Sequence, residues 1–308
     1  MKGKYMKAAI YEEYGPPNVL KMMEVAKPTP GDDQVLVKVV ATTVSSGDVR
    51  MRKPDIPGSI IEKLLARLFL GINKPKRKIL GMQIAGVVES VGKNVQRFDI
   101  GDEVFASTGM SFGGYAEYKC MPENSAIAKK PTNMSFEEAS AVPIPGLGAL
   151  ALVKKSGVEK GKKVLVCGAS GSVGTFTIQL AKYFGGEVTA VCSSGNFKLA
   201  KSLGASKTID YNKEDFTKSK IKYDCVIDAI GKTLKSACKG IIAPNGKFIS
   251  MHYVSYKDTV EDLIFLKTLI EKDKVKSVID KVYPIERIGE AHEYVEKGHK
   301  KGNVIIQI

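Results

Sequence analysis

The sequence predicts an α/β protein of two domains: a small, irregular β domain and a doubly wound parallel sheet of five strands. Three observations predict this class. Strand-like segments punctuated by Gly and Pro fill about the first 120 residues. After Ser135, strands alternate with segments of helix length, and a glycine-rich turn joins the first of these strands to a helix. The 308 residues, 44% apolar and 26% charged, suffice for two domains with a substantial core.

The first domain is expected to span residues 1–123 together with 276–308. Its strands include Gln34–Val40 and Ala85–Val91, both rich in the β-branched residues that pack well in a sheet. Between them, apolar side chains recur every three or four positions from Ile60 to Leu70, which predicts a helix covering the domain. The alternative for this segment is a helix that lies on a membrane surface.

The second domain, residues 124–275, is expected to begin with a helix capped by Ser135, with Glu138 as its partner in a capping box. Five strands follow, at Lys163–Cys167, Glu187–Cys192, Lys207–Tyr211, Asp224–Asp228 and Lys247–Met251, with helices that begin near Val173, Asn196, Asp215 and Thr233. The chain then continues through a helix over Thr259–Lys272, a strand over Val278–Val282, a helix over Ile285–Lys297 and a strand over Val304–Ile308. Because no low-complexity linker is visible, we expect a close interface with a cleft between the domains.

The bulk properties restrict the class of partner. The formal charge of +14 favours anionic partners such as phosphates or nucleic acid. Local clusters such as Lys74–Lys78 are short and lack interleaved aromatic residues, which favours a solvated lysine-rich surface over a nucleic-acid face. No stretch approaches the roughly 18 apolar residues of a membrane span, so a cytoplasmic protein is expected. The five scattered cysteines indicate neither a disulfide framework nor a metal site.

The most informative segment is the glycine-rich turn after the strand Lys163–Cys167. Gly168 and Gly171 permit a tight turn that approaches a pyrophosphate closely, and Gly174 allows the following helix to pack against the sheet. The backbone of Ala169, Ser170, Ser172 and Val173 then presents N–H groups at the positive end of that helix. The preceding strand, the following helix and a second strand about twenty residues on favour dinucleotide binding over a purely structural turn.

The end of the second strand favours NADP(H) as the cofactor, with NAD(H) as the alternative. A carboxylate there would bind the ribose 2′-hydroxyl and repel a 2′-phosphate, but the segment that follows Cys192 has no acid. Hydrogen-bond donors stand there instead, in Ser193, Ser194 and Asn196, and Lys198 adds a positive charge. In the alternative interpretation, Lys198 is an ordinary exposed helix residue, and only the neutral donors bind the phosphate.

Short motifs along nearly the whole chain match one known family in order. They are Met6-Lys7-Ala8-Ala9, Gly86-Val87-Val88-Glu89-x-Val91-Gly92, Gly101-Asp102-Glu103-Val104-Phe105, Gly113-Gly114-Tyr115-Ala116-Glu117-Tyr118, the glycine turn, Leu203-Gly204-Ala205 and Ile209-Asp210-Tyr211. The chain resembles the quinone oxidoreductase branch of the medium-chain dehydrogenase/reductases. The resemblance implies a GroES-like β domain joined to a Rossmann-type domain. It also implies a sheet that has lost the sixth strand of relatives, and a monomer or an atypical homodimer.

The resemblance also implies a set of site residues. Residues aligned with Ser193, Asn196 and Tyr211 surround the 2′-phosphate in relatives, which often have Arg where this chain has Gly195. Relatives usually have Asn at the position of Ser45, Asp or Glu at that of Gln83 and Thr at that of Gly148. In relatives this Thr contacts the nicotinamide carboxamide. The cleft is expected to be lined by Ser45, Ser46, Asp48, the segment Pro143–Gly148, the loop after Ile230 and the strand end Ser250–His252.

Zinc-dependent relatives bind their metal with a Cys from a Cys-His-x-Asp stretch, a His-Glu pair and a further Cys. The corresponding positions here are Ser45-Ser46-Gly47-Asp48 and Gly81-Met82-Gln83, without thiolate or imidazole, so no zinc is expected. A nicotinamide can reduce quinones and α,β-unsaturated carbonyls without a metal, because their conjugation accepts the electrons. The expected substrate is therefore a small carbonyl, quinone or enone.

The candidate catalytic residues are Ser46, Asp48 and His252. Asp48 orients the nicotinamide ribose or relays a proton, or else caps the helix that follows it. His252 is a candidate proton donor, although a histidine at a strand end is more often simply exposed or hydrogen-bonded. Two other classes of function stay open: an RNA-binding or structural protein, and an NADPH-binding redox sensor that has kept the fold with little turnover.

Overall fold

The computed structural model describes residues 4–54 and 70–308, and the chain divides into two compact units. Unit 1 comprises Met1–Ile144, Asp258–Leu263 and Ile279–Ile308, and unit 2 comprises Pro145–Lys257 and Ile264–Val278. The helix predicted over Ile60–Leu70 lies outside the described residues, except for its last residue. Among the helices that the structure describes, none has the length and apolar character needed to cross a bilayer.

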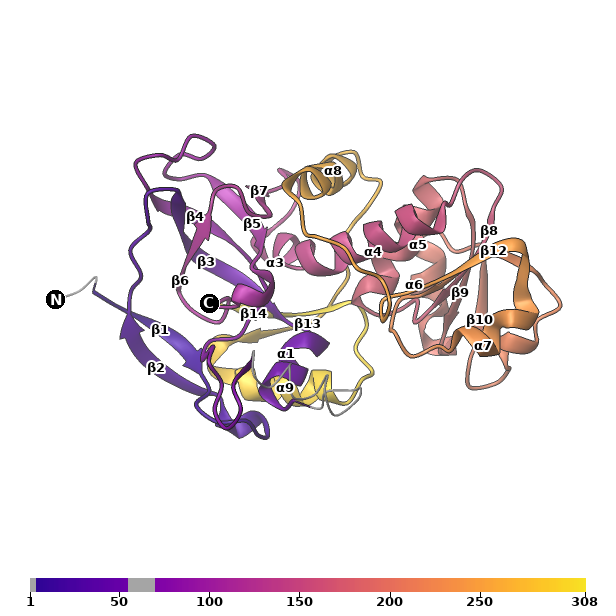
Figure 1. The fold of residues 1–308 in the computed structure, drawn as a ribbon, viewed down its shortest axis with the longest axis horizontal. Coiled ribbons are helices and arrows are strands. Elements are labelled where there is room, and N and C mark those ends of the chain that lie inside the picture. The colour runs from indigo at the N-terminus through magenta and orange to yellow at the C-terminus, as the bar shows by residue number, and fades with distance from the viewer. Residues whose placement is uncertain (1–3, 55–69) are drawn as a thin grey trace. The chain divides into compact units, whose positions relative to one another are not determined.

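Unit 1 is built on a seven-stranded sheet and a separate two-stranded one (Figure 1). The long strand β3 (Gln34–Val44) is central, because it pairs antiparallel with β4, β6 and β14. Its pairing with β14 joins the C-terminal strands β13 and β14 to the N-terminal strands of the sheet. The other strands are β1 (Tyr5–Ile10), β2 (Lys21–Ala26), β4 (Gln83–Val91), β5 (Glu103–Ser107), β6 (Tyr118–Pro122), β7 (Ile127–Lys129), β13 (Ile279–Pro284) and β14 (Asn303–Gln307).

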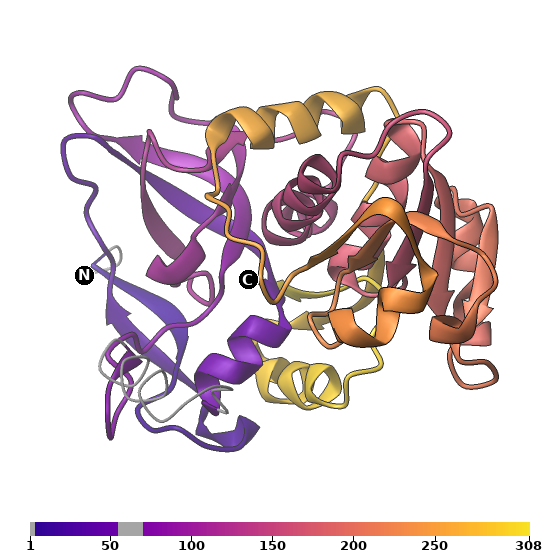
Figure 2. The same cartoon turned by 45° about the vertical axis from the view of Figure 1, so that its right-hand side comes forward.

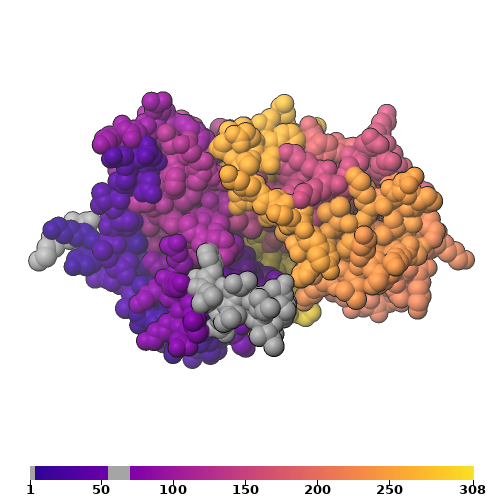
Figure 3. All heavy atoms as spheres, in the orientation of Figure 1, coloured from indigo at the N-terminus to yellow at the C-terminus, as the bar shows by residue number. Residues whose placement is uncertain are grey.

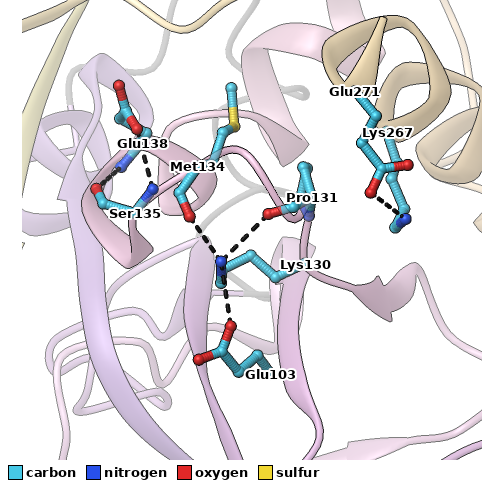
Figure 4. A network of polar contacts seen from close by, with 8 residues as sticks. All are labelled: Glu103, Lys130, Pro131, Met134, Ser135, Glu138, Lys267 and Glu271. Carbon is cyan, nitrogen blue, oxygen red and sulfur yellow. Dashed lines mark hydrogen bonds and ion pairs between the residues drawn. The ribbon is translucent and has the colours of Figure 1, made fainter.

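The predicted capping box at Ser135 is confirmed and starts helix α3 (Phe136–Ser140). The Ser135 hydroxyl accepts from the Glu138 N–H at 3.2 Å, and the Glu138 carboxylate accepts from the Ser135 N–H at 2.9 Å (Figure 4). The turn before the helix is held by the buried ammonium of Lys130, which contacts the main-chain oxygens of Pro131 and Met134 and the carboxylate of Glu103.

Two helices of unit 1 lie side by side, α1 (Ser46–Arg52) and α9 (Ile288–Glu296), as Figures 1 and 2 both show. The apolar face of α9 packs into a core that includes Leu80, Phe112 and Tyr115. The helix predicted over Ile285–Lys297 exists, but its first turn, Ile285–Arg287, is a 3-10 turn. This packing matters for the site because α1 carries Asp48.

Unit 2 contains the predicted five-stranded parallel sheet, in the order β10-β9-β8-β11-β12. The strands are β8 (Lys163–Cys167), β9 (Glu187–Cys192), β10 (Lys207–Asp210), β11 (Tyr223–Asp228) and β12 (Ile242–Ser250). The chain winds outward from β8 to β10, then returns to place β11 on the other side of β8. The strand order therefore reverses between β8 and β11, where open α/β sheets bind ligands at the carboxyl ends of the strands.

The helices of unit 2 are α5 (Ser172–Tyr183), α6 (Phe197–Ser202) and α7 (Lys235–Cys238), with the greater parts of α4 (Pro143–Ser156) and α8 (Val260–Glu271). The prediction of a helix beginning near Asp215 is wrong, because Phe216–Lys218 forms one 3-10 turn. There the Asp215 carboxylate accepts from both the N–H and the hydroxyl of Thr217, a local bond that competes with helix formation. The edge strand β12 and the residues after it form part of the unit's surface (orange in Figure 3).

Candidate functional site: a nucleotide site and a polar cluster

The carboxyl ends of three neighbouring strands in unit 2 lie in one row. Cys167 pairs with Asp228, and Asp228 pairs with Ser250, so β8, β11 and β12 end at the same edge of the sheet. The glycine turn leaves β8 at this edge, and the predicted residues Ile230 and Ser250 lie there too. The structure thus brings together, at the point of strand reversal, residues that are far apart in the sequence.

The glycine turn needs glycine at two positions. Gly168 has φ of +71°, and a Cβ there would lie 2.4 Å from a methyl of Ile230. A Cβ on Gly174 would lie 2.1 Å from the main-chain oxygen of Gly168, so any side chain would force the start of α5 away from the turn. These two glycines fix the close packing of strand, turn and helix that a pyrophosphate site requires.

The third glycine of the turn is not required by packing. A Cβ on Gly171 would meet the Gly168 oxygen at 3.5 Å, an ordinary contact. Gly171 is the N-cap of α5, and without a side chain it cannot accept hydrogen bonds from the first-turn N–H groups. The helix that begins at Ser172 therefore presents its positive end without a side-chain cap, which suits a phosphate group.

A second polar cluster follows β9. The Asn196 amide donates to the hydroxyls of Ser170 and Ser193 at 3.1 and 3.0 Å, which joins the glycine turn to the loop after β9. Asn196 is 8% exposed, and its Oδ1 has no partner among the residues that the structure describes. Because the Ser170 and Ser193 hydroxyls both accept from Asn196, their own hydrogens remain available to an acceptor such as a phosphate oxygen.

The neighbouring strand β10 holds this loop in place through Asp210, a residue to which the sequence analysis gave no role. Its carboxylate accepts from the Asn212 N–H at 3.0 Å and from Ser194, and the Asn212 bond holds the Asp210 pKa below its usual range. A hollow of about 360 Å³ follows directly, lined by Tyr211, Asn212, Lys213, Glu214, Asp215 and Phe216. Tyr211 and Lys198 are both exposed beside this loop.

Asp228, a second carboxylate that the sequence analysis did not assign, shapes the loop after β11. It is fully buried and accepts from the N–H groups of Ile230, Gly231 and Thr233 at 3.3, 3.2 and 3.1 Å. It also accepts from the Ser250 hydroxyl at 2.8 Å. Ser250, a predicted cofactor residue, is thus engaged in fixing the loop that carries Ile230.

The remaining predicted residues of unit 2 lie near the end of β12. Gly148 is buried in α4, and a Cβ there would lie 3.0 Å from the hydroxyl of Tyr256 and 3.4 Å from Met251. His252 is exposed, its N–H donates to the Ser250 hydroxyl at 3.2 Å, and its ring packs edge-on against Tyr253. The space that the Thr of relatives would use at position 148 is therefore taken by Tyr256.

In unit 1, Asp48 is not the cap of a following helix but lies in the first turn of α1, as the partner of the N-cap Ser45 in a capping box. Ser45 is the N-cap of α1, and its hydroxyl donates to the Asp48 carboxylate at 2.6 Å. The same carboxylate accepts from the N–H groups of Ser45 and Gly81 at 2.9 and 3.0 Å. Burial raises the pKa of Asp48 to about 6 despite these bonds. Ser46, the predicted catalytic serine, is exposed beside this pair.

The comparisons with known proteins agree on one family. A model of the alcohol dehydrogenase GroES-like domain matches residues 31–132, and one described as zinc-binding dehydrogenase matches residues 172–284. The chain is 35% identical to a 2-methylene-furan-3-one reductase of Solanum lycopersicum, over 98% of this chain and 79% of that protein. It is 33% identical to a chloroplastic NADPH-dependent alkenal/one oxidoreductase of Arabidopsis thaliana, over 98% of this chain and 80% of that protein. The structure of the quinone oxidoreductase from Coxiella burnetii matches with a TM-score of 0.83 and 29% identity, over 99% of this chain and 100% of that chain.

The chain belongs to the medium-chain dehydrogenase/reductase superfamily, in its quinone oxidoreductase and alkenal/one reductase branch. This branch consists of NAD(P)H-dependent oxidoreductases. The fold agrees, since the superfamily combines a GroES-like β unit with a Rossmann-type sheet, which has five strands in this chain.

In this chain, the side chains at the family's metal position do not fit a catalytic zinc. Ser45 is bonded to Asp48, and the Gln83 amide donates to the Thr43 hydroxyl at 2.6 Å and accepts from the Ile144 N–H at 2.8 Å. Serine hydroxyls and amides are poor substitutes for the thiolate and imidazole ligands of zinc. Within the described parts of the chain, no three His, Cys, Asp or Glu side chains converge on a metal position.

Proposed function

We propose that the protein transfers hydride from NADPH to the conjugated carbonyl of a small enone or quinone, without a metal. The observation that carries this proposal is the glycine turn joined by Asn196 to the loop after β9. The turn suits a pyrophosphate, and the loop offers neutral donors with no carboxylate at the position that would repel a 2′-phosphate. The names of two relatives, one an alkenal/one oxidoreductase and one a quinone oxidoreductase, support the substrate class.

In this proposal each element of unit 2 has a separate task. The first turn of α5 holds the pyrophosphate. The hydroxyls of Ser170 and Ser193 accept from Asn196, so their own hydrogens are left to donate to the 2′-phosphate, beside Lys198 and Tyr211. Ile230 lies over the glycine turn, on the loop fixed by Asp228, where it excludes water from the bound cofactor. A reduced nicotinamide supplies the hydride, and a conjugated acceptor needs no Lewis acid to accept it.

The proton that completes the reduction is assigned to the Ser45–Asp48 pair. A buried carboxyl with a pKa of about 6 is partly protonated near neutral pH, the condition for an efficient general acid. Its partner Ser45 is half-buried and bonded to it at 2.6 Å. When the Asp48 carboxyl is protonated it donates to the Ser45 oxygen, so Ser45 can give its own hydrogen to the substrate as it takes the proton of Asp48, which is left as a carboxylate. His252 remains an exposed alternative donor, and it lacks a comparable hydrogen-bonded partner among the bonds that the structure describes for its ring.

The test is a turnover assay with both cofactors. The purified protein is mixed with NADPH or NADH and then with a panel of quinones, enones and saturated aldehydes, while the nicotinamide absorbance is followed. The proposal predicts oxidation of NADPH in preference to NADH with the conjugated acceptors, and unchanged rates after treatment with a zinc chelator. Loss of activity on chelation, or reduction of saturated aldehydes alone, would contradict it.

A further inference from the structure

The segment that follows β12 in unit 2, residues 251–257, runs over α4 (orange in Figures 1 and 2). A turn starts it, since the main-chain oxygen of Ser250 accepts from the next two free N–H groups of the turn at 3.0 and 2.9 Å. Further along, the Lys155 ammonium donates to the main-chain oxygen of Ser255 at 2.5 Å. The segment is therefore fixed both to the end of β12 and to α4.

The next residue, Tyr256, brings its hydroxyl to the same face of α4. The hydroxyl oxygen lies 3.0 Å from the position that a Cβ on Gly148 would occupy, and the side chain of Met251 lies 3.4 Å from that position. Gly148 and Lys155 are two helical turns apart, so both contacts of the segment are on one face of the helix.

This contact explains a glycine in the middle of α4. Glycine is unfavourable in a helix interior relative to alanine, so its presence at position 148 calls for a packing reason. The Tyr256 hydroxyl supplies that reason, because an added methyl group 3.0 Å from it would force one of the two to move. Gly148 thus leaves room for a hydroxyl that comes from another part of the chain.

The place of this hydroxyl relative to a bound dinucleotide follows from the strand order. In the proposed function, the loop after β9 meets the 2′-phosphate of the adenosine half and the turn after β8 meets the pyrophosphate. A dinucleotide lies across the point of strand reversal, so its nicotinamide half extends the other way, over the carboxyl ends of β11 and β12. Met251 and Tyr256 belong to the chain that leaves β12 at this edge.

Other polar side chains at this end of β12 are engaged or exposed. The Ser250 hydroxyl already donates to Asp228 at 2.8 Å. His252 and Ser255 are exposed, and Tyr253 is 69% exposed. Tyr256 is half-buried, so its hydroxyl is placed where a ligand is partly shielded from water.

We propose that the Tyr256 hydroxyl hydrogen-bonds to the carboxamide of the bound nicotinamide, and that Gly148 is glycine because it leaves room for this hydroxyl. The proposal rests on the proposed function, since it adds one residue to the cofactor site. A carboxamide has an oxygen that accepts and an amino group that donates, and a tyrosine hydroxyl can pair with either. The bond holds the nicotinamide ring against rotation.

The test compares Tyr256→Phe with the wild type by calorimetric titration with NADPH and with 2′-phospho-ADP-ribose. The second ligand has the phosphates and both riboses of NADPH but no nicotinamide. We expect Tyr256→Phe to bind NADPH about tenfold more weakly, because the carboxamide loses a partner, and to bind 2′-phospho-ADP-ribose as the wild type does. The control, Tyr253→Phe, removes an exposed tyrosine hydroxyl from the same segment and should bind both ligands normally.

A hydroxyl supplied from α4 instead should restore the lost affinity. Gly148→Ser and Gly148→Ala are each combined with Tyr256→Phe, which removes the oxygen that crowds position 148. We expect the combination with Ser to bind NADPH within about threefold of the wild type, and the combination with Ala to stay about tenfold weaker. The two combinations differ by one hydroxyl, so a purely steric effect would not separate them.

Three results would overturn the proposal. Equal losses for NADPH and 2′-phospho-ADP-ribose would show that the hydroxyl only supports the structure. Unchanged or tighter NADPH binding by Tyr256→Phe would show that it makes no bond to the nicotinamide. Equal binding by the combinations with Ser and Ala would show that a hydroxyl at this place is not what matters.

Failure of the proposed function has a different signature. A wild type that binds neither ligand overturns the dinucleotide site and this inference with it. A wild type that binds both ligands without turnover overturns only the hydride transfer, and the titrations still decide the role of Tyr256. If Tyr256→Phe does not fold, a crystal structure of the wild type with NADP⁺ decides. A hydroxyl within about 3.2 Å of the carboxamide supports the proposal, and a longer distance overturns it.

Discussion

Around the loop after β9, the side chains expected to meet a 2′-phosphate are neutral, apart from the exposed Lys198. Asn196 is the centre of this group, since its amide joins Ser170 to Ser193. Gly195 lies next to it in open space, with nothing within 4 Å of the position of a Cβ. The residue therefore leaves room for a longer side chain, and relatives often have Arg at this place.

We expect Gly195→Arg to increase the affinity for NADPH about tenfold and to leave the affinity for NADH nearly unchanged. The reason is that a guanidinium there would pair with the 2′-phosphate, and a charge-assisted bond of this kind contributes roughly 1.5–3 kcal/mol. Fluorescence titration with both cofactors measures the change, with Gly195→Ala as the matched control. An equal gain for NADH would mean that the loop does not meet the 2′-phosphate.

Asp48 and His292 have opposite effects on stability in acid. Asp48 has a folded pKa of about 6, above its unfolded value, so its contribution is fully present below about pH 4 and lost as pH rises through 6. Burial lowers the folded pKa of His292, on α9, to about 3, below its unfolded value. Its contribution is present above about pH 6.5 and lost as pH falls toward 3. Between pH 4 and 6, the change of the free energy of unfolding with pH that Asp48 causes opposes the change that His292 causes.

Urea unfolding of Asp48→Asn and His292→Gln at several pH values between 4 and 6.5 separates these two contributions. Relative to the wild type, Asp48→Asn should lose stability as pH falls, because His292 alone then remains. His292→Gln should gain stability as pH falls, because Asp48 alone remains. Each slope approaches about 1.4 kcal/mol per pH unit at most. Parallel profiles for the wild type and both variants would contradict the assigned pKa values.

The element of greatest consequence is the turn from β8 into α5. Its glycines serve different ends: Gly168 and Gly174 are required by the packing of the protein itself, whereas Gly171 has room for a side chain. A turn selected for packing alone would need only the first two. At Gly171, the absence of a side chain is not needed for packing and leaves space that a phosphate group can occupy.

Gly171→Ala should leave the free energy of unfolding within about 0.5–1 kcal/mol of the wild type and weaken NADPH binding at least tenfold. The added methyl group meets protein atoms at ordinary distance but occupies the approach of the pyrophosphate to the first turn of α5. Urea unfolding and fluorescence titration check the two parts. Gly195→Ala is again the control, and equal binding by Gly171→Ala would show that the phosphates lie elsewhere.

At the scale of the whole molecule, the sequence predicted most of the second unit and less of the site. Two strands, β8 and β9, have the predicted bounds because short apolar runs end at a glycine or a polar turn. The capping box of Ser135 and Glu138 was also visible, since its two residues lie three positions apart. The similar box of Ser45 and Asp48 was missed, because Asp48 was interpreted as a possible cap of a later helix. The helix predicted near Asp215 was wrong because the segment lacks an apolar stripe, and its local side-chain bonds favour a turn.

The residues that sequence reasoning missed share a different property. Tyr115 and His292 are 177 positions apart, and Asp228 and Ser250 are 22 apart, so no periodicity or spacing connects them. Tyr115 stood in a recognised motif, but the bond of its hydroxyl to His292 depends on a helix from the other end of the chain. Likewise, the monomer or atypical dimer, the cytoplasmic location and the catalytic residues remain predictions, since each depends on partners outside the chain.

The central claim is that the turn from Gly168 to Gly174 binds the phosphates of NADPH. Isothermal titration calorimetry of the wild-type protein with NADPH, in the absence of any acceptor, tests it most directly. The account predicts one site per chain in the micromolar range, with weaker binding of NADH. The claim would be contradicted if NADPH at millimolar concentration gave no measurable heat of binding and did not protect the protein from unfolding.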